Sequence, residues 1–264
     1  MFNIDCYAYS NKLRSCHPGE KFVFAFLTMA ICLAFPSRTA SLAVIVLMAG
    51  AAILGAGIPW RVYIKLMSVP LSFLLAGAAA IAVSVSRGGG PVYGITIGVF
   101  TLGVSPRDFS TAADVLFKSL GSVSCLYFLS LTTPVTEIIS VLKKMRIPAL
   151  FIELMSLVYR FIFVMMETAS RIYVAQSSRW GYASFKTSYR SLSRLLSAVF
   201  LRSYYRSQMT YTALVSRCYT GELNVIEPRY AASVKNIMLI VLIEILLLAL
   251  TLYGGGVPVG GIHS

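Results

Sequence analysis

Charged residues are scarce in this 264-residue chain: Asp, Glu, Lys and Arg make up 12% of it, whereas a soluble protein contains about 25%. Hydrophobic residues make up 57%, and the mean hydropathy is +0.77. These values exclude a soluble globular protein. They indicate a membrane protein with several spans, because an apolar stretch of about 20 residues crosses a hydrocarbon core of about 30 Å.

Few side chains in the sequence are suited to metal binding or to acid–base catalysis. There are two histidines, and the five cysteines are scattered without a Cys-x-x-Cys pair, which favours neither a disulfide framework nor a zinc site. The motifs of serine hydrolases, zinc proteases and P-loop ATPases are also missing. We therefore predict a protein that is not an enzyme, holds no metal and does not hydrolyse ATP itself.

Long uncharged runs dominate the sequence instead. They predict five membrane-spanning helices, at about 22–36, 40–57, 66–86, 109–132 and 235–253. A further uncharged run, 88–106, is rich in glycine and poor in helix formers, so we expect an outer loop with a partly inserted segment there. The predicted fold class is all-α, a polytopic membrane protein with a bundle of four spans at 1–132, cytoplasmic helices at 133–234, and a final span with an outer tail at 235–264.

The net charge of +13 is concentrated in one segment. Between Lys143 and Arg217 there are 12 Lys or Arg residues and only two acidic ones, Glu153 and Glu167. The positive-inside rule predicts that this segment and the N-terminus are cytoplasmic and that the C-terminus is outside. We expect this positive charge to interact with anionic headgroups of membrane lipids and not with nucleic acid.

Two amphipathic helices are predicted inside the basic segment. The first, at about 149–176, has a single polar stripe made of Glu153, Arg160, Glu167 and Arg171. Within this stripe, Glu167 and Arg171 are spaced to form an i,i+4 ion pair. The second helix, at about 187–218, carries leucine, valine and phenylalanine on one face and most of its arginines elsewhere. Such helices lie in the membrane interface or pack together as a dock for a soluble partner.

Each amphipathic helix ends in a small–Arg–x element, Ser178-Arg179-Trp180 in the first and Ser216-Arg217-Cys218 in the second. Gly181 and Gly221 follow, where C-terminal helix caps are expected. Each arginine could simply interact with the helix dipole, a contribution of about 0.3–1 kcal/mol. Alternatively, the guanidinium groups extend beyond the helix ends as forks for acidic grooves on a partner, and two such ends would suit an ATPase dimer.

Ionisable residues also occur within the predicted spans. Glu244 lies among leucines and isoleucines near the middle of the last span, where an ionisable side chain is costly and suggests a function. Contact with a polar partner subunit and burial as the protonated acid explain it equally well. Asp114 and Lys118, four residues apart in the fourth span, are expected to neutralise each other.

Several short segments occur in the order found in one known family. They are Ile4-Asp5-x-Tyr7-Ala8-Tyr9-x-Asn11-x-Leu13-Arg14, His17-Pro18 with Lys21, Leu131-Thr132-Thr133-Pro134, Tyr159-Arg160-x-Ile162-Phe163, and the two small–Arg–x elements. By this pattern the chain resembles the CbiQ family, the transmembrane T components of energy-coupling-factor importers for cobalt. That family often has glycine as the third residue of the arginine element, where this chain has Trp180 and Cys218.

The resemblance implies a non-catalytic energy-coupling subunit of an ATP-driven cobalt importer in the inner membrane of a prokaryotic cell, feeding cobalamin synthesis. Its partners would be two cytoplasmic CbiO-like ATPase subunits, which bind the ATP, a CbiM-like metal-binding membrane subunit and a small CbiN-like accessory subunit. Arg179 and Arg217 would each couple to one ATPase, and Arg160 and Glu244 are candidate partner contacts. No cofactor is expected on this chain, and the complex as a whole carries the cobalt ion.

Small residues in the second and third spans, Gly50-Ala51-Ala52 with Gly55 and Ala76 to Ala80, would let helices of the metal-binding subunit approach closely. A nickel importer of the same construction is an alternative, because the selecting site would lie on another chain. A stand-alone secondary carrier or channel would more naturally show inverted repeats, and none is evident. An intramembrane enzyme would need a cluster of polar side chains that face a cavity, and the only candidates for it in the spans are Asp114, Lys118 and Glu244.

Overall fold

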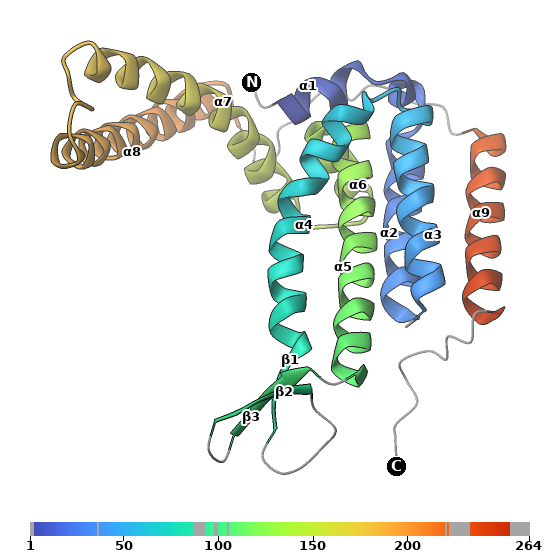
Figure 1. Cartoon of the computed structure of the whole chain (residues 1–264). Coiled ribbons are helices and arrows are strands. Elements are labelled where there is room, and N and C mark those ends of the chain that lie inside the picture. Colours follow the sequence, from blue (N-terminus) through green and yellow to red (C-terminus); the bar gives the residue numbers. More distant parts are fainter. Residues whose placement is uncertain are drawn as a thin grey trace. The chain divides into compact units, whose positions relative to one another are not determined.

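A computed structural model of the chain describes residues 3–35, 37–86, 93–97, 100–104, 106–219, 221 and 233–253. The chain forms two compact units (Figure 1). Phe2–Pro134 together with Arg229–Ser264 is termed the bundle unit, and Val135–Pro228 is termed the hairpin unit.

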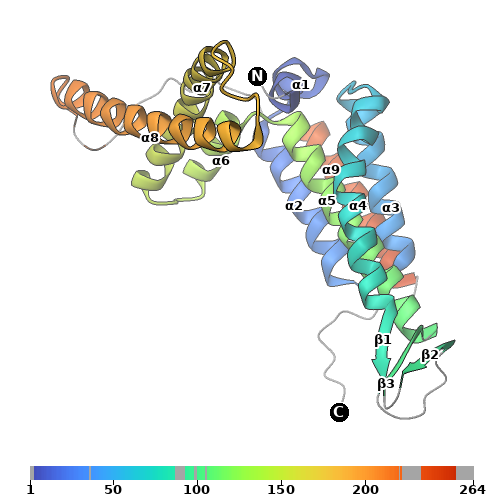
Figure 2. The same cartoon turned by 60° about the vertical axis from the view of Figure 1, so that its left-hand side comes forward.

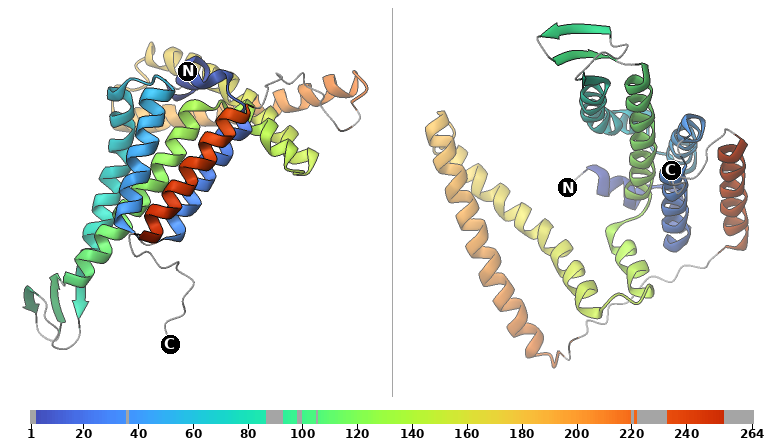
Figure 3. Two further views of the ribbon diagram at one scale, coloured as in Figure 1. Left: turned by 90° about the vertical axis from the view of Figure 1, so that its right-hand side faces the viewer. Right: turned by 90° about the horizontal axis from the view of Figure 1, so that it is seen from below.

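The bundle unit is built mainly from helices. They are α1 (Asn3–Ser10), the 3-10 helix η1 (Lys12–Ser15), α2 (Pro18–Ala34), α3 (Arg38–Gly50) with its π-helical continuation η2 (Ala51–Gly55), α4 (Trp60–Ala82), α5 (Pro106–Thr132) and α9 (Val234–Tyr253). Helix α5 contacts α1, α2, α3 and α4, while α9 packs against α2 and α3 (Figure 3). Helix α5 is therefore the element around which the bundle is assembled.

Local sequence sets where α2 and α3 begin. The His17 Nδ1 accepts a hydrogen bond from the Gly19 N–H at 3.0 Å, and Pro18 occupies the start of α2, where an N–H would have no helical partner. Ser37 caps α3 through its side-chain oxygen. These caps lie directly before the apolar runs that predicted the first two spans.

The interior of the bundle unit is closely packed. Cys32, Val44, Met48 and Leu131 are fully buried. A Cβ atom on Gly121 of α5 would lie 2.8 Å from the Cys32 Sγ of α2, closer than such atoms can approach. Glycine at position 121 therefore permits the close contact between these two helices.

Five helices in the described part of the chain are long and apolar enough to cross a membrane, judged by length and composition. They are Arg38–Gly55, Trp60–Ala82, Asp108–Thr132, Ala149–Ser177 and Val234–Thr251. Four predicted spans correspond to helices of this set. The predicted first span, 22–36, corresponds to the 17-residue α2, whereas Ala149–Ser177, predicted as a cytoplasmic helix, has the length and hydropathy of a span because its polar stripe is narrow.

The region after α4 differs from the prediction. The predicted span 66–86 ends as a helix at Ala82, and Val83–Ser86 forms strand β1. In place of the expected loop at 88–106, Tyr93–Ile97 forms β2 and Phe100–Val104 forms β3, and these three strands make an antiparallel sheet in the order β1-β3-β2. Glycine content suggested a loop, but alternating Ile, Thr, Phe, Leu and Val residues favour strands.

The described part of the hairpin unit consists of α6 (Val135–Lys144), α7 (Ala149–Ser177) and α8 (Phe185–Val215) (Figure 2). Helix α7 packs against α6 and against α8, and the short connection between α7 and α8 returns the chain antiparallel. Ser184 and Thr187 form a capping box at the start of α8. The two predicted amphipathic helices are confirmed as α7 and α8, the second ending at Val215.

Candidate functional site

Helix α7 ends in a Schellman motif that holds Arg179 at its tip. The Gly181 N–H donates to the Gln176 carbonyl at 2.9 Å and the Trp180 N–H to the Ser177 carbonyl at 3.1 Å, the two bonds that define this motif. Trp180 has a φ of 57°, the left-handed conformation that the motif requires. Arg179 is exposed just before this residue.

Helix α8 ends in the same way. The Tyr219 N–H donates to the Leu214 carbonyl at 3.1 Å and the Cys218 N–H to the Val215 carbonyl at 3.0 Å. Cys218 has a φ of 59°, and Arg217 is exposed immediately before it. The positions of the two arginines in their helix ends are thus equivalent.

The serine of each small–Arg–x element makes the same hydrogen bond as well. The Ser178 Oγ donates to the Val174 carbonyl at 3.0 Å, and the Ser216 Oγ donates to the Thr212 carbonyl at 2.9 Å. The structure therefore builds all six predicted tip residues into two copies of one geometry. Since α8 has 31 residues, the two tips lie at opposite ends of a helix about 45 Å long.

The third residue of each element, where the family often has glycine, adopts the left-handed conformation in this chain. Left-handed backbone costs a residue other than glycine about 1–2 kcal/mol, which explains why glycine suits this position. The prediction that Gly181 and Gly221 are the caps is wrong in detail, because the left-handed residues that end the helices are Trp180 and Cys218. Trp180 is 82% exposed, so the hydrogen bonds of the motif hold it in this conformation without burial.

Gly181 is nevertheless required for close packing at the first tip. A Cβ atom there would lie 2.7 Å from the Gln176 carbonyl oxygen. The Gln176 side chain donates to the Ser191 carbonyl at 3.1 Å and accepts from the Tyr182 hydroxyl at 2.8 Å, while the Ser191 Oγ donates to the Gly181 carbonyl at 2.8 Å. This network fixes the α7 tip against the first turns of α8.

The second tip is held by a different contact, which the sequence did not reveal. The Tyr219 hydroxyl donates a hydrogen bond to the carboxylate of Glu153 near the start of α7. Glu153 is 8% exposed, so this member of the predicted polar stripe is buried. A tyrosine directly after the small–Arg–x element was the available signal.

Glu244 and Arg160, the candidate partner contacts, have different environments. Glu244 is 5% exposed within the bundle unit, and its Oε1 accepts a hydrogen bond from the Thr28 Oγ1 at 2.7 Å. Its Oε2 is buried and has no hydrogen-bond partner among the residues that the structure describes. Arg160 is exposed on α7. The structure thus places Glu244 in the chain's own core and Arg160 on its surface.

Two predicted ion pairs have opposite outcomes. The pair of Glu167 and Arg171 is confirmed, with 2.6 Å between the carboxylate and the guanidinium. The prediction that Asp114 pairs with Lys118 is wrong, because Asp114 of α5 pairs with Arg38 of α3. Packing of α3 on α5 brings that arginine to the carboxylate, a contact that spacing within one helix cannot show.

A family model described as cobalt transport protein CbiQ matches residues 10–228. The chain belongs to the CbiQ family. It is 29% identical to the cobalt transport protein CbiQ of Rhodobacter capsulatus over 247 residues, which cover 94% of this chain and 96% of that protein. It is also 29% identical to the CbiQ protein of Salmonella typhimurium over 225 residues, or 85% of this chain and all of that one.

A third relative is a fused protein. This chain is 35% identical over 218 residues to a putative fused cobalt transport protein CbiMQ of Methanocorpusculum labreanum. The match covers 83% of this chain and 36% of the fused protein. Family membership and the span-length helices together establish a multi-pass membrane protein of a cobalt transport family.

The N-terminal CbiQ-like residues meet the end of α5 in the structure. The Asn11 Nδ2 lies 3.3 Å from the Leu131 carbonyl oxygen and 3.1 Å from that of Thr132, and the Lys21 Nζ donates to the Thr132 carbonyl at 3.1 Å. Asn11 and Lys21 are both buried. They satisfy carbonyls that a helix C-terminus leaves without helical partners, and the ammonium group complements the negative end of the helix dipole.

The described residues contain no group of three or more His, Cys, Asp or Glu side chains that could hold a metal ion. The chemistry that the arrangement offers is instead recognition of acidic groups, by two exposed guanidinium forks on fixed helix ends.

Proposed function

We propose that this chain is the energy-coupling membrane subunit of an ATP-driven cobalt importer, non-catalytic itself and serving cobalt supply for cobalamin synthesis. The observation that carries the proposal is the pair of equivalent arginine tips at Arg179 and Arg217. Two recognition elements of equivalent geometry on one chain suit two copies of one partner. Two CbiO-like ATPase subunits, which bind and hydrolyse the ATP, are partners of this kind.

Each guanidinium group enters an acidic groove on one ATPase subunit. An arginine can bind a carboxylate with two parallel hydrogen bonds, which fixes orientation as well as affinity. The Schellman motifs and their supporting contacts keep each arginine in place when the ATPase subunits move. Ser178, Trp180, Ser216 and Cys218 therefore act as positioning residues for the two arginines.

Helices α7 and α8 transmit the movement. Helix α8 runs for 31 residues between the two tips, and the contacts of Gln176 and of Tyr219 tie its two ends to α7. Closure of the ATPase dimer would then move the helix pair as one piece. In this proposal the hairpin unit and the N-terminus are cytoplasmic, as the basic charge of the segment favours.

A CbiM-like subunit that binds the metal packs on the small-residue face of α4, with a small CbiN-like subunit as a further companion. Two observations support this site. The apolar window of α4 contains no residue buried within this chain, and nothing lies within 4 Å of a Cβ atom built on Gly77. In the CbiMQ relative, the part that matches this chain belongs to a longer fused protein, which supports a CbiM-like partner. Cobalt is the cargo of the complex, and no cofactor is assigned to this chain.

Charge reversal at both tips tests the coupling role. The Arg179→Glu/Arg217→Glu variant should still enter the membrane. The amount of ATPase subunit that copurifies with it and the rate of cobalt uptake should each fall at least tenfold, because carboxylates would then face acidic grooves. The matched control is Arg190→Glu/Arg194→Glu, which changes the net charge equally on exposed residues of α8. Retention of the ATPases and of uptake by the tip variant would overturn the proposal.

A further inference from the structure

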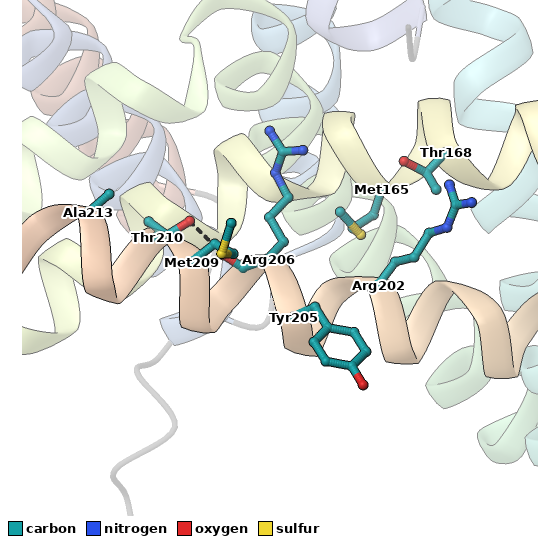
Figure 4. Close-up of a pocket in the computed structure, with 8 residues that line it drawn as sticks. All are labelled: Met165, Thr168, Arg202, Tyr205, Arg206, Met209, Thr210 and Ala213. Atoms are coloured by element: carbon teal, nitrogen blue, oxygen red, sulfur yellow. Dashed lines mark hydrogen bonds between the residues drawn. The ribbon is translucent and has the colours of Figure 1, made fainter.

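A pocket of about 530 Å³ lies between α7 and α8. Its lining consists of Met165 and Thr168 from α7, and Arg202, Tyr205, Arg206, Met209, Thr210 and Ala213 from α8. Figure 4 shows the guanidinium groups of Arg202 and Arg206 extending from α8 toward α7. The volume lies within the range of about 300–1,000 Å³ that small-ligand sites occupy.

The pocket is suited to an anion. Arg202 and Arg206 are four residues apart, which places their side chains side by side on the helix. Helix α8 contains no Asp or Glu between Phe185 and Val215, and neither arginine forms an ion pair with a described residue. The guanidinium group of each arginine provides the fork geometry that binds phosphate.

The threonine hydroxyls in the lining do not compete as donors. The Thr168 Oγ1 donates to the Val164 carbonyl at 2.9 Å, and the Thr210 Oγ1 donates to the Arg206 carbonyl at 2.8 Å. The polar donors that remain in the lining are the two guanidinium groups, which are charged, and the Tyr205 hydroxyl.

The rest of the pocket and its surroundings are apolar. Met165, Met209 and Ala213 face the same space as the arginines, and thioether side chains adapt to flexible apolar ligands. Along α8, exposed apolar and aromatic residues alternate with the basic ones, among them Leu196, Phe200, Leu201 and Tyr204. A basic helix with exposed leucine and aromatic residues is typical of the membrane interface.

We propose that the α7–α8 pocket is a binding site for one anionic phospholipid. Arg202 and Arg206 hold the phosphate of the headgroup, and Met165 and Met209 contact the first part of the acyl chains. Free phosphate would use the guanidinium groups alone and leave the apolar wall unoccupied. The site is distinct from the proposed ATPase contacts, and it stands on the pocket whether or not the coupling role is correct.

Titration of the purified full chain in neutral detergent with short-chain phosphatidylglycerol, followed by native mass spectrometry, tests the site. One lipid per chain should bind saturably, while short-chain phosphatidylcholine should bind at least tenfold more weakly. The Arg202→Gln/Arg206→Gln variant should bind phosphatidylglycerol about 25-fold more weakly, since each basic residue contributes about fivefold toward an anionic lipid. Thr168→Asp should weaken it as well, by adding a negative charge without changing α8.

The matched control is Arg190→Gln/Arg194→Gln, which removes the same charge from the same helix. Arg194 is eight residues from Arg202, about 12 Å along the helix, beyond the Debye length of about 8 Å at physiological salt. The affinity of this control variant for phosphatidylglycerol should stay within about twofold of that of the parent chain. Equal losses in both double variants would overturn the site, as would equal binding of phosphatidylcholine.

Two further outcomes would assign the pocket to other ligands. Competition by inorganic phosphate at concentrations equal to the lipid would identify a free-phosphate site and overturn the lipid proposal. If Arg202→Gln/Arg206→Gln kept its lipid affinity but lost a partner subunit on purification, the pocket would be a protein contact, and the lipid proposal would be wrong.

Discussion

The hydrogen bond between Tyr219 and Glu153 gives a direct test of how the second arginine tip is held. Tyr219→Phe removes the hydroxyl and leaves the ring in place. A hydrogen bond to a charged group contributes about 1.5–3 kcal/mol, which corresponds to about 10- to 150-fold in the opening equilibrium of the tip. The Cys218 and Tyr219 amides are the donors of the Schellman motif at this tip, so opening exposes them to solvent.

Amide hydrogen exchange of the purified protein should report the change. Exchange at positions 218 and 219 should accelerate at least tenfold in Tyr219→Phe, while exchange at positions 180 and 181 of the other tip should not change. Glu153→Gln, which keeps a neutral acceptor, should give a smaller effect because hydrogen bonds to charged groups are roughly twice as strong. Tyr182→Phe is the matched control, since it loosens the first tip only.

Unchanged protection at positions 218 and 219 in Tyr219→Phe would refute the idea that this hydroxyl fixes the tip. Equal acceleration at both tips would refute it in another way, because it would indicate general loosening of the helix pair. If the proposed coupling role is correct, cobalt uptake by Tyr219→Phe should fall together with its protection.

Two further predictions concern the bundle unit. Gly121→Ala should lower the free energy of unfolding by about 1–3 kcal/mol, because its Cβ would lie 2.8 Å from the Cys32 Sγ. In a thermal unfolding assay in detergent, adding Cys32→Gly to the same chain should restore much of the loss. An unaltered melting temperature in the single variant would contradict the close contact. Lys21→Met should lower the free energy of unfolding by about 1–3 kcal/mol, because it removes the ammonium group from the Thr132 carbonyl. The control Lys65→Met, at an exposed position, should have little effect. Equal melting temperatures for the two variants would show that the buried contact is not stabilising.

Much of the helical architecture could be predicted from the sequence, because each signal is local. Runs of uncharged residues predicted the helices of the bundle, and the spacing of polar residues predicted α7 and α8 with the Glu167–Arg171 pair. The small–Arg–x elements could be found because they are contiguous. Local composition was misleading at 88–106, where glycine content concealed the strands β2 and β3.

The contacts that shape the site depend on residues far apart in the chain. Tyr219 meets Glu153, Lys21 meets Thr132, and Arg38 displaces Lys118 as the partner of Asp114. The left-handed conformation that Trp180 and Cys218 share also appears only in the backbone angles, because neither residue type favours it. By itself the sequence determined the long helices and where the arginines lie along them. The tertiary structure alone decided which side chains hold those arginines, since that depends on how the faces of separate helices pack together.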